Sequence, residues 1–208
     1  MRVAVSGTHC CGKSMLIDEF LLTHPDFAHE PEPYTVLEED YGEVFAAEPS
    51  AEDFYRQLEF YVDRLRSYSS AQRVIYERSP VDFLAYLLAL NDLRRGEHSK
   101  RLVEESLGMV MDAVQFLDLI VFLPLNDEDG ILMPDAEDPE LRSAVNSLLI
   151  GIFADDDFDL FASHRPAIVE VTGSTAQRRR MLEIALGRLQ AKAKTGEDAA
   201  QVNNLQGL

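Results

Sequence analysis

The 208-residue sequence is poor in positive charge and contains no long apolar run. It has 19 lysines and arginines against 37 aspartates and glutamates, which gives a formal net charge of −18. Proteins that bind nucleic acids neutralise phosphates with a basic face, so we expect no nucleic-acid partner. Because no stretch of about 18 apolar residues occurs, we expect neither a membrane span nor a membrane partner.

Cysteine is also scarce, and tryptophan is absent. The two cysteines, Cys10 and Cys11, are adjacent, which does not suit a disulfide framework. The start, Met1-Arg2-Val3, leads directly into an apolar segment with no signal-peptide pattern. We therefore expect the protein in a reducing compartment, the cytoplasm.

The length and composition are those of one domain. With 46% apolar and 27% charged residues, the chain can bury a sizeable core without being divided. We expect a single domain over residues 1–192. The sequence turns polar after Ala191, so residues 193–208 are expected to form a flexible tail.

The most informative motif lies near the N-terminus and follows the apolar run Val3-Ala4-Val5. It fits the pattern G-x-x-x-x-G-K-[ST] in full, and apolar residues at helical spacing follow it. Its residues are Gly7, Thr8, His9, Cys10, Cys11, Gly12, Lys13 and Ser14. A strand, a glycine-containing loop and a helix in this order predict a phosphate-binding P-loop.

Each part of this loop has an expected role. Gly7 and Gly12 let the backbone curl, so that the main-chain amides of the four residues between them point at phosphate oxygens. Lys13 supplies a cation to the β- and γ-phosphates, and the Ser14 hydroxyl is a ligand for Mg²⁺. The expected cofactors are therefore ATP and Mg²⁺.

The rest of the sequence alternates between predicted strands and predicted helices, which is typical of a parallel sheet with helices on both faces. Strands are expected at about 2–6, 27–29, 73–77, 119–123 and 167–171. Helices are expected at about 13–23, 51–69, 80–93, 99–116, 139–153 and 175–189. We therefore predict an α/β fold of the P-loop NTPase type, with three layers and a five-stranded parallel sheet.

A second group of polar residues, Glu77-Arg78-Ser79, ends the predicted strand at 73–77. Ligands bind at the carboxyl edge of such sheets. Glu77 is placed there to hold Mg²⁺, and Arg78 to steady a transferring phosphoryl group or a substrate hydroxyl. Alternatively, Glu77 and Arg78 form a pair that only fixes the start of the next helix, because Ser79-Pro80 suits an N-cap and a first turn.

Together, the P-loop, the Glu-Pro segment after the second strand and the stretch Gln72 to Pro80 resemble deoxynucleoside kinases and ribosylnicotinamide-kinase-like P-loop proteins. The segment Val169 to Ser174, followed by Arg178, resembles the adenine-side loop of the same group. The resemblance implies phosphoryl transfer from ATP to a small hydroxyl compound. It also implies that Arg178 stacks on the adenine.

In this family, a glutamate after the second strand acts as the base near the attacking hydroxyl. Glu30 and Glu32 each precede a proline. Glu32 matches the family's Pro-Glu-Pro run and is the expected base, while Glu30 remains the alternative and is a candidate substrate-binding residue. Gln57, on the helix that resembles the substrate-side helix, is expected to bond a nucleobase. Four aromatic residues either line the substrate ring or belong to the core: Phe54, Tyr61, Phe83 and Tyr86.

The expected lid, at about residues 126–142, departs from the family pattern. Lids of this family supply two or more arginines over the phosphates, but Asn126 to Leu141 contains neither arginine nor lysine. Arg142 is the first cation after this segment. If the site is catalytic, we expect Arg142 to do the work of the lid.

Two classes of function follow. The first is a kinase that transfers the γ-phosphate of Mg-ATP to a hydroxyl of a nucleoside-like molecule, with Lys13, Glu32, Arg78 and Arg142 as catalytic residues. The second is a P-loop ATPase or nucleotide-binding switch that acts on a partner protein, which the cation-free lid favours. An apolar helix face serves either the core or a homodimer: Leu84, Leu87, Leu88 and Leu90.

Overall fold

The computed structural model describes residues 1–45, 50–69, 71–95, 98–126 and 138–205, with the backbone alone for 193–205. Its centre is a five-stranded sheet in the order β2-β3-β1-β4-β5, in which all neighbouring strands are parallel. The strands are β1 (Arg2–Ser6), β2 (Ala28–Glu30), β3 (Val74–Glu77), β4 (Leu119–Phe122) and β5 (Ala167–Glu170). The predicted α/β fold is therefore confirmed.

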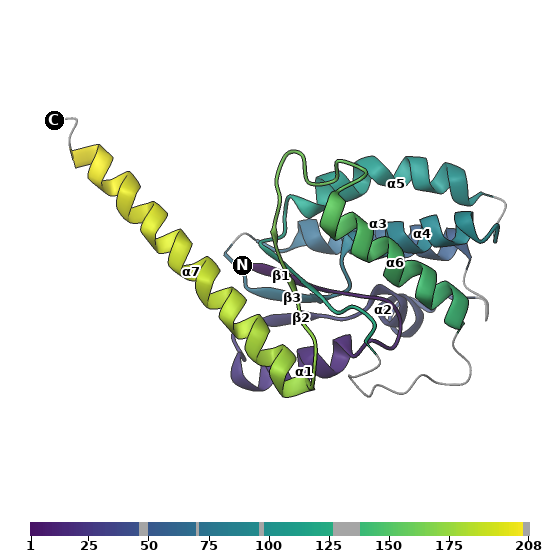
Figure 1. The fold of residues 1–208 in the computed structure, drawn as a ribbon, viewed down its shortest axis with the longest axis horizontal. Coiled ribbons are helices and arrows are strands. Elements are labelled where there is room, and N and C mark those ends of the chain that lie inside the picture. Colours follow the sequence, from purple (N-terminus) through teal and green to yellow (C-terminus); the bar gives the residue numbers. More distant parts are fainter. Residues whose placement is uncertain (46–49, 70, 96–97, 127–137, 206–208) are drawn as a thin grey trace.

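The helices cover both faces of this sheet (Figure 1). They are α1 (Lys13–Thr23), α2 (Pro33–Glu39), α3 (Ala51–Ser67), α4 (Pro80–Asp92), α5 (Ser99–Val114), α6 (Pro139–Asp155) and α7 (Thr175–Leu205). Helices α1 and α7 pack on one face, while α3, α4, α5 and α6 form the layer on the other. Right-handed crossovers between parallel strands produce this three-layer arrangement.

Alternation along the strands divides the core into two clusters. Val3 and Val5 of β1 face the cluster with α1 and α7, whereas Ala4 between them faces the cluster with α3 to α6. Ile120 and Val121 of β4 likewise face opposite sides. Successive strand side chains point to opposite faces, so the near-continuous apolar runs of these central strands match a sheet covered on both sides.

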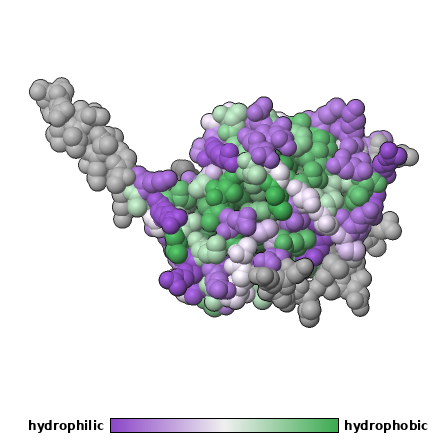
Figure 2. All heavy atoms as spheres, viewed as in Figure 1, coloured by the Kyte–Doolittle hydropathy of each residue, from purple (hydrophilic) through white to green (hydrophobic). Residues whose placement is uncertain are grey.

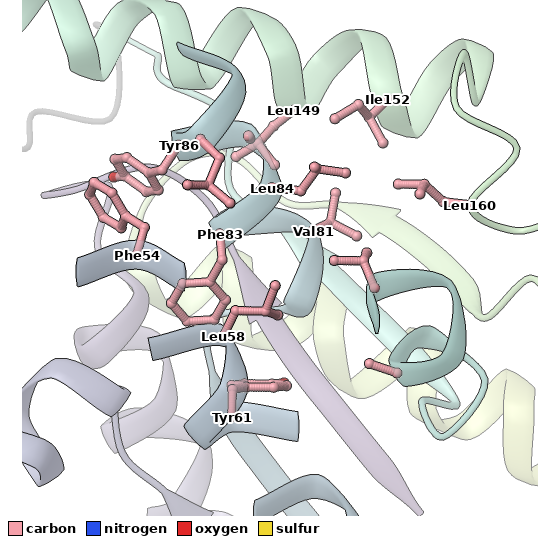
Figure 3. Close-up of a cluster of buried hydrophobic side chains, with 14 of the residues drawn as sticks. Phe54, Leu58, Tyr61, Val81, Phe83, Leu84, Tyr86, Leu149, Ile152 and Leu160 are labelled. Atoms are coloured by element: carbon pink, nitrogen blue, oxygen red, sulfur yellow. The ribbon is translucent and has the colours of Figure 1, made fainter. Parts of the chain in front are cut away.

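Helix α4 is the most deeply buried helix of the larger cluster (Figure 3). Its first eleven residues, Pro80 to Leu90, are all buried. A helix that is apolar all round must lie inside the protein, and α4 packs between α3, α5 and α6. The leucines considered for a homodimer face, Leu84, Leu87, Leu88 and Leu90, therefore belong to the core.

Two elements differ from the prediction. Helix α2 is absent from the predicted helices. Its first residue is Pro33, at a position where the missing N–H of proline costs nothing. Helix α7 was predicted to end near Leu189 but continues to Leu205, away from the body of the molecule (Figure 1). The flexibility expected of residues 193–208 stays a prediction.

Strand β5 lies at one edge of the sheet and is less covered than the three central strands, β3, β1 and β4. Ala167, Ile168 and Val169 are only half-buried. Hydrophobic residues gather near the middle of the face that carries this part of the chain (Figure 2).

Among the residues described, no helix has the length and apolarity needed to cross a bilayer.

We expect Leu84→Ala to lower the free energy of unfolding by about 2–5 kcal/mol, because it removes a fully buried side chain from α4 and leaves a cavity. Leu22→Ala on α1 is the control, since that side chain is 84% exposed and its loss should cost less than about 0.5 kcal/mol. Urea denaturation of both variants measures the difference. Equal losses would contradict the described burial.

Candidate active site

The P-loop joins β1 to α1 at the carboxyl edge of the sheet. Gly7 and Gly12 have φ angles of 150° and 90°, which favour glycine. A Cβ on Gly7 would lie 2.6 Å from Cys11 Sγ and 2.7 Å from the Leu123 carbonyl oxygen, so only glycine fits there. Both glycines of the motif thus have the backbone role that the sequence predicts.

Cations from three helices hold the carbonyl oxygens of this loop. Lys13 Nζ donates to Gly7 O at 3.1 Å and to Thr8 O at 2.8 Å. Arg142 Nε donates to His9 O at 2.9 Å and its Nη2 to Cys10 O at 3.0 Å, while Arg178 Nη1 donates to Cys11 O at 2.7 Å. The carbonyls of five consecutive residues, 7 to 11, are therefore bonded to positive side chains.

These contacts place three predicted site residues on the loop itself. Lys13 is almost fully buried, and its pKa is raised: burial alone would lower it, but the charges of Cys11 and Glu32 outweigh burial. Arg142, expected as the cation of the lid, and Arg178, expected at the adenine, both bond the P-loop backbone. Most of the expected lid, residues 127–137, lies outside the described residues.

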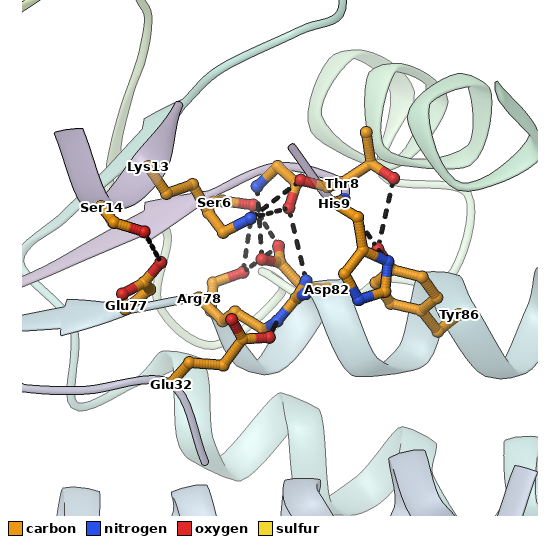
Figure 4. A network of polar contacts seen from close by, with 12 residues as sticks. Ser6, Thr8, His9, Lys13, Ser14, Glu32, Glu77, Arg78, Asp82 and Tyr86 are labelled. Atoms are coloured by element: carbon orange, nitrogen blue, oxygen red, sulfur yellow. Dashed lines mark hydrogen bonds and ion pairs between the residues drawn. The ribbon is translucent and has the colours of Figure 1, made fainter. Parts of the chain in front are cut away.

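Ser14 and Glu77 come together next to the loop. Ser14 Oγ donates a hydrogen bond of 2.7 Å to Glu77 Oε1 (Figure 4). The parallel pairing of β1 and β3 explains this contact, because it brings the ends of both strands to the same edge. A hydroxyl and a carboxylate side by side are oxygen ligands that suit Mg²⁺, which keeps several waters and needs few protein ligands.

Arg78 is the largest fully buried polar side chain of the site, with 1% exposure. Its Nε is hydrogen-bonded to Glu32 Oε1, its Nη1 lies 3.5 Å from Gly7 O, and its guanidinium lies 5.1 Å from the centre of the Tyr86 ring. Its φ angle of 75° is unusual for a residue with a side chain. Such strain marks positions that the surrounding structure holds in place, often at functional sites.

The two candidate glutamates have different surroundings. Glu32 precedes α2 and pairs with Arg78 beside the P-loop (Figure 4). Glu30 instead accepts two hydrogen bonds from Arg64, at 2.6 Å and 2.8 Å, and one from the Tyr68 hydroxyl at 2.6 Å. Glu30 therefore ties β2 to the end of α3, while Glu32 is the glutamate that joins the P-loop group.

The charge of Glu32 is fixed by its neighbours. Burial alone would raise the pKa of its carboxyl, but the positive charges of Arg78 and Lys13 lower it to about 2. The pKa of Arg78 is correspondingly raised well above its usual value, because Glu32 outweighs the effect of burial. The pair is thus ionised at neutral pH.

Asp82 is a site residue that the sequence analysis missed. It is fully buried on α4, accepts hydrogen bonds from the Ser6 and Ser79 hydroxyls, and lies 3.2 Å from the Gly7 amide. Burial raises the pKa of its carboxyl although Arg78 acts in the opposite direction. The signal in the sequence was one acidic residue within the apolar run of α4, where an unpartnered carboxylate would be costly.

The aromatic residues whose role was left open divide between core and site. Phe54 and Tyr61 are buried in the larger cluster, and Phe54 stacks on Tyr86 with ring centres 4.3 Å apart. The Tyr86 hydroxyl, however, reaches the P-loop, where it contacts Thr8 and His9. Gln57 is buried on α3, one turn from Phe54, so the structure places it near this stack.

Comparison with known proteins bears on the fold. No protein-family model matches the sequence, and no curated protein matches it at a significant level. Solved structures do match. Deoxyadenosine kinase from M. mycoides with bound dATP has a TM-score of 0.59 at 12% identity, over 90% of this chain and 99% of that one.

Two further structures share the fold. Thymidylate kinase from Candida albicans matches with a TM-score of 0.57 at 14% identity, over 90% of this chain and 91% of that one. The NadR protein in complex with NAD and AMP-PNP matches with a TM-score of 0.62 at 16% identity, over 89% of this chain and 49% of that one. The chain thus spans about half the length of NadR. It has the fold of P-loop nucleoside and nucleotide kinases.

The Glu32–Arg78 pair predicts a pH dependence of stability. The folded pKa of Glu32, about 2, lies below that of an unfolded glutamate, so its contribution is complete above about pH 5 and is lost as the pH falls toward 2. Glu32→Gln should cost about 3 kcal/mol at neutral pH, because it leaves Arg78 buried without its partner. Urea denaturation should show this difference from wild type shrinking below about pH 5.

Glu104→Gln is the matched control, since Glu104 is an exposed glutamate on α5. It should change the stability by less than about 0.5 kcal/mol at any pH. A cost of Glu32→Gln that does not vary with pH would show that the carboxylate charge is not what matters.

Proposed function

We propose that the protein is a P-loop phosphotransferase that moves the γ-phosphate of Mg-ATP to a hydroxyl of a nucleoside-like molecule. One observation carries this proposal: Lys13, Arg78 and Glu32 converge beside the loop at one edge of the sheet (Figure 4). This group combines a phosphate-binding loop, a buried cation and an ionised carboxylate. Phosphoryl transfer depends mainly on positioning and charge stabilisation, which such a group supplies.

On the donor side, the main-chain amides of residues 8 to 11 and Lys13 bind the phosphates of ATP. Lys13 leaves the carbonyls of Gly7 and Thr8 to do so, since its ammonium now donates to them. Ser14 and Glu77 would hold Mg²⁺, which neutralises charge on the phosphate oxygens. Arg178 is assigned to the adenine side of the site, where its hydrogen bond to Cys11 O holds the loop in place.

On the acceptor side, Glu32 accepts a hydrogen bond from the attacking hydroxyl and Arg78 steadies the group in transfer. A carboxylate with a pKa of about 2 is a weak base. It is nevertheless sufficient, because the transition state of phosphoryl transfer is loose and needs little proton removal before bond formation. Glu32 therefore mainly orients the hydroxyl and takes the proton late. Gln57 is the candidate for contact with the nucleobase.

The balance of charge around β2, α2 and α3 favours an acceptor without a phosphate group. Three arginines in this region pair with carboxylates, Arg78 with Glu32, Arg64 with Glu30 and Arg56 with Glu43, while Arg66 of α3 is exposed. A nucleoside monophosphate would need unmatched cations for its own phosphate. We therefore assign a nucleoside, or another uncharged or cationic hydroxyl compound, rather than a nucleotide as acceptor.

A P-loop ATPase or switch module is the second candidate. The cation-free segment Asn126 to Leu141 favours it, because a lid with few cations gives less stabilisation to a transferred phosphate. In that case, water replaces the acceptor hydroxyl and the same loop binds ATP. Acceptor dependence of turnover separates the two candidates.

Lys13→Ala should reduce ATP affinity by about 100-fold or more, because it removes the cation that faces the β- and γ-phosphates. Titration of a fluorescent ATP analogue measures this loss. Lys100→Ala, which changes an exposed lysine on α5, is the control and should leave affinity unchanged. Unchanged binding in Lys13→Ala would overturn the donor side of the proposal.

ADP release should rise with an acceptor present, measured first with Mg-ATP alone and then with nucleosides, ribosylnicotinamide, sugars and nucleoside monophosphates. We expect nucleosides to stimulate turnover more than their monophosphates. Glu32→Gln should lower the stimulated rate by about 100-fold. Glu30→Gln is the matched variant and should retain the rate, because Glu30 holds Arg64 and Tyr68 instead. If no acceptor raises the rate, the kinase proposal fails and the ATPase remains.

A further inference from the structure

The Tyr86 hydroxyl makes three contacts with the P-loop. It lies 2.9 Å from the His9 amide nitrogen, 2.6 Å from His9 Nδ1 and 3.2 Å from Thr8 Oγ1. Tyr86 itself is fully buried and stacked on Phe54, so its hydroxyl has a fixed position. A rigid side chain on α4 thus holds both the backbone and the ring of His9 (Figure 4).

The donors and acceptors in this cluster determine which ring nitrogen of His9 carries the proton. A tyrosine hydroxyl has one proton to donate and two lone pairs to accept. It accepts from the His9 amide, and either hydroxyl of the Thr8–Tyr86 contact could donate; the arrangement in which Thr8 donates gives its fully buried hydroxyl an acceptor. Its own proton then goes to His9 Nδ1, at the shortest of the three contacts. In this arrangement, His9 carries its proton on Nε2.

The surroundings of the ring keep it neutral. Burial and the positive charges of Arg78, Lys13 and Arg142 lower the pKa of His9 to about 3, although Glu32 acts in the opposite direction. Arg78 follows β3, Lys13 and Arg142 lie on α1 and α6, and Glu32 precedes α2, while Tyr86 faces the ring from α4. Unlike Thr8, His9 is only partly buried, so the ring can still meet a ligand.

His9 is part of the P-loop, so its neutral ring could donate a hydrogen bond to a phosphoryl group bound there. Lys13, assigned to the donor side, and Glu32 and Arg78, assigned to the acceptor side, all act on the charge of this ring. The phosphoryl group must pass between these residues. The expected lid, from Asn126 to Leu141, contains no arginine that could stabilise the phosphoryl group. A hydrogen-bond donor built into the P-loop would supply part of the missing stabilisation.

We infer that His9 is a catalytic residue, whose Nε2–H donates a hydrogen bond to an oxygen of the phosphoryl group during transfer, with Tyr86 as its positioning residue. The inference rests on the proposed phosphotransferase. In the step, the bond from the γ-phosphorus to the β,γ-bridging oxygen breaks, and a bond to the acceptor oxygen forms. The hydroxyl proton goes to Glu32, and His9 keeps its proton throughout.

Two substitutions of His9 differ in the atom that they retain. His9→Gln places an amide N–H near the position of Nε2, whereas His9→Asn keeps a polar atom near Nδ1 only. His9→Asn should lower kcat by about 10- to 100-fold with ATP affinity changed less than about threefold, and His9→Gln should recover part of the loss. His29→Asn, an exposed histidine on β2, is the control and should match wild type. Equal kcat for all four proteins would overturn the inference.

Tyr86→Phe tests the positioning role. It should lower kcat in the wild-type background but add little in the His9→Asn background, because both changes remove the same donor. Independent, additive losses would show that Tyr86 acts through the fold instead. Measurement of Mg-ATP hydrolysis, with water as acceptor, applies the same comparison even if no acceptor is found. In that way, failure of the kinase proposal is distinguished from failure of the role of His9.

A spectroscopic measurement tests the proton position without turnover. In the ¹⁵N spectrum of histidine-labelled protein, the signals that disappear in His9→Asn should be those of a neutral ring with Nε2 protonated, unchanged between about pH 5 and pH 8. Tyr86→Phe should allow the other tautomer to appear. A His9 ring protonated on Nδ1 in the wild-type protein would contradict the inference.

Discussion

The buried guanidinium of Arg78 is the constraint on which the rest of the site depends. A charge with 1% exposure needs a carboxylate beside it, and Glu32 fills that need from the segment before α2. The Tyr61 hydroxyl and the Val5 carbonyl hold the Arg78 backbone in its left-handed conformation. The same guanidinium reaches Gly7 O and the Tyr86 ring. Strand β3, the P-loop, α2 and α4 therefore meet at one side chain, so a change at Arg78 would disturb both sides of the site.

Charge is the second constraint, because the proposed function requires a chain with a net charge of −18 to bind an anion. The structure gathers four of its cations around one loop: Lys13, Arg78, Arg142 and Arg178. Their contacts with the loop carbonyls neutralise the negative ends of the peptide dipoles there. The amide side of the loop then faces a phosphate with a positive local potential, even though the protein as a whole repels anions. Arg142 and Arg178 can thus favour nucleotide binding without touching the nucleotide.

Most helices and strands were predicted correctly from the sequence, because a periodic pattern of apolar residues can be recognised within each segment alone. The contact of Ser14 with Glu77 also followed from the sequence, since parallel strands present their carboxyl ends at one edge. Glu32 was preferred to Glu30 only through the Pro-Glu-Pro resemblance; the pairing of Glu30 with Arg64, which lies 34 residues away along the chain, could not be predicted. Asp82 was missed for the same reason: besides Ser79, three residues before it in the sequence, its partners Ser6 and Gly7 come from β1 and the P-loop. Periodicity carries no information about which distant polar groups will meet.

The position of Arg142 bears on the expected lid, whose sequence from Asn126 to Leu141 contains no arginine or lysine. A lid arginine stabilises phosphate only when the lid closes, and its ordering costs conformational entropy at each turnover. Here Arg142 bonds the backbone of the P-loop, while Arg78 is held by Glu32 and His9 by Tyr86. Groups fixed in this way need no reorganisation when charge develops on the phosphoryl group. A site preorganised within the loop and the sheet edge can therefore depend less on its lid than the sequence alone indicates.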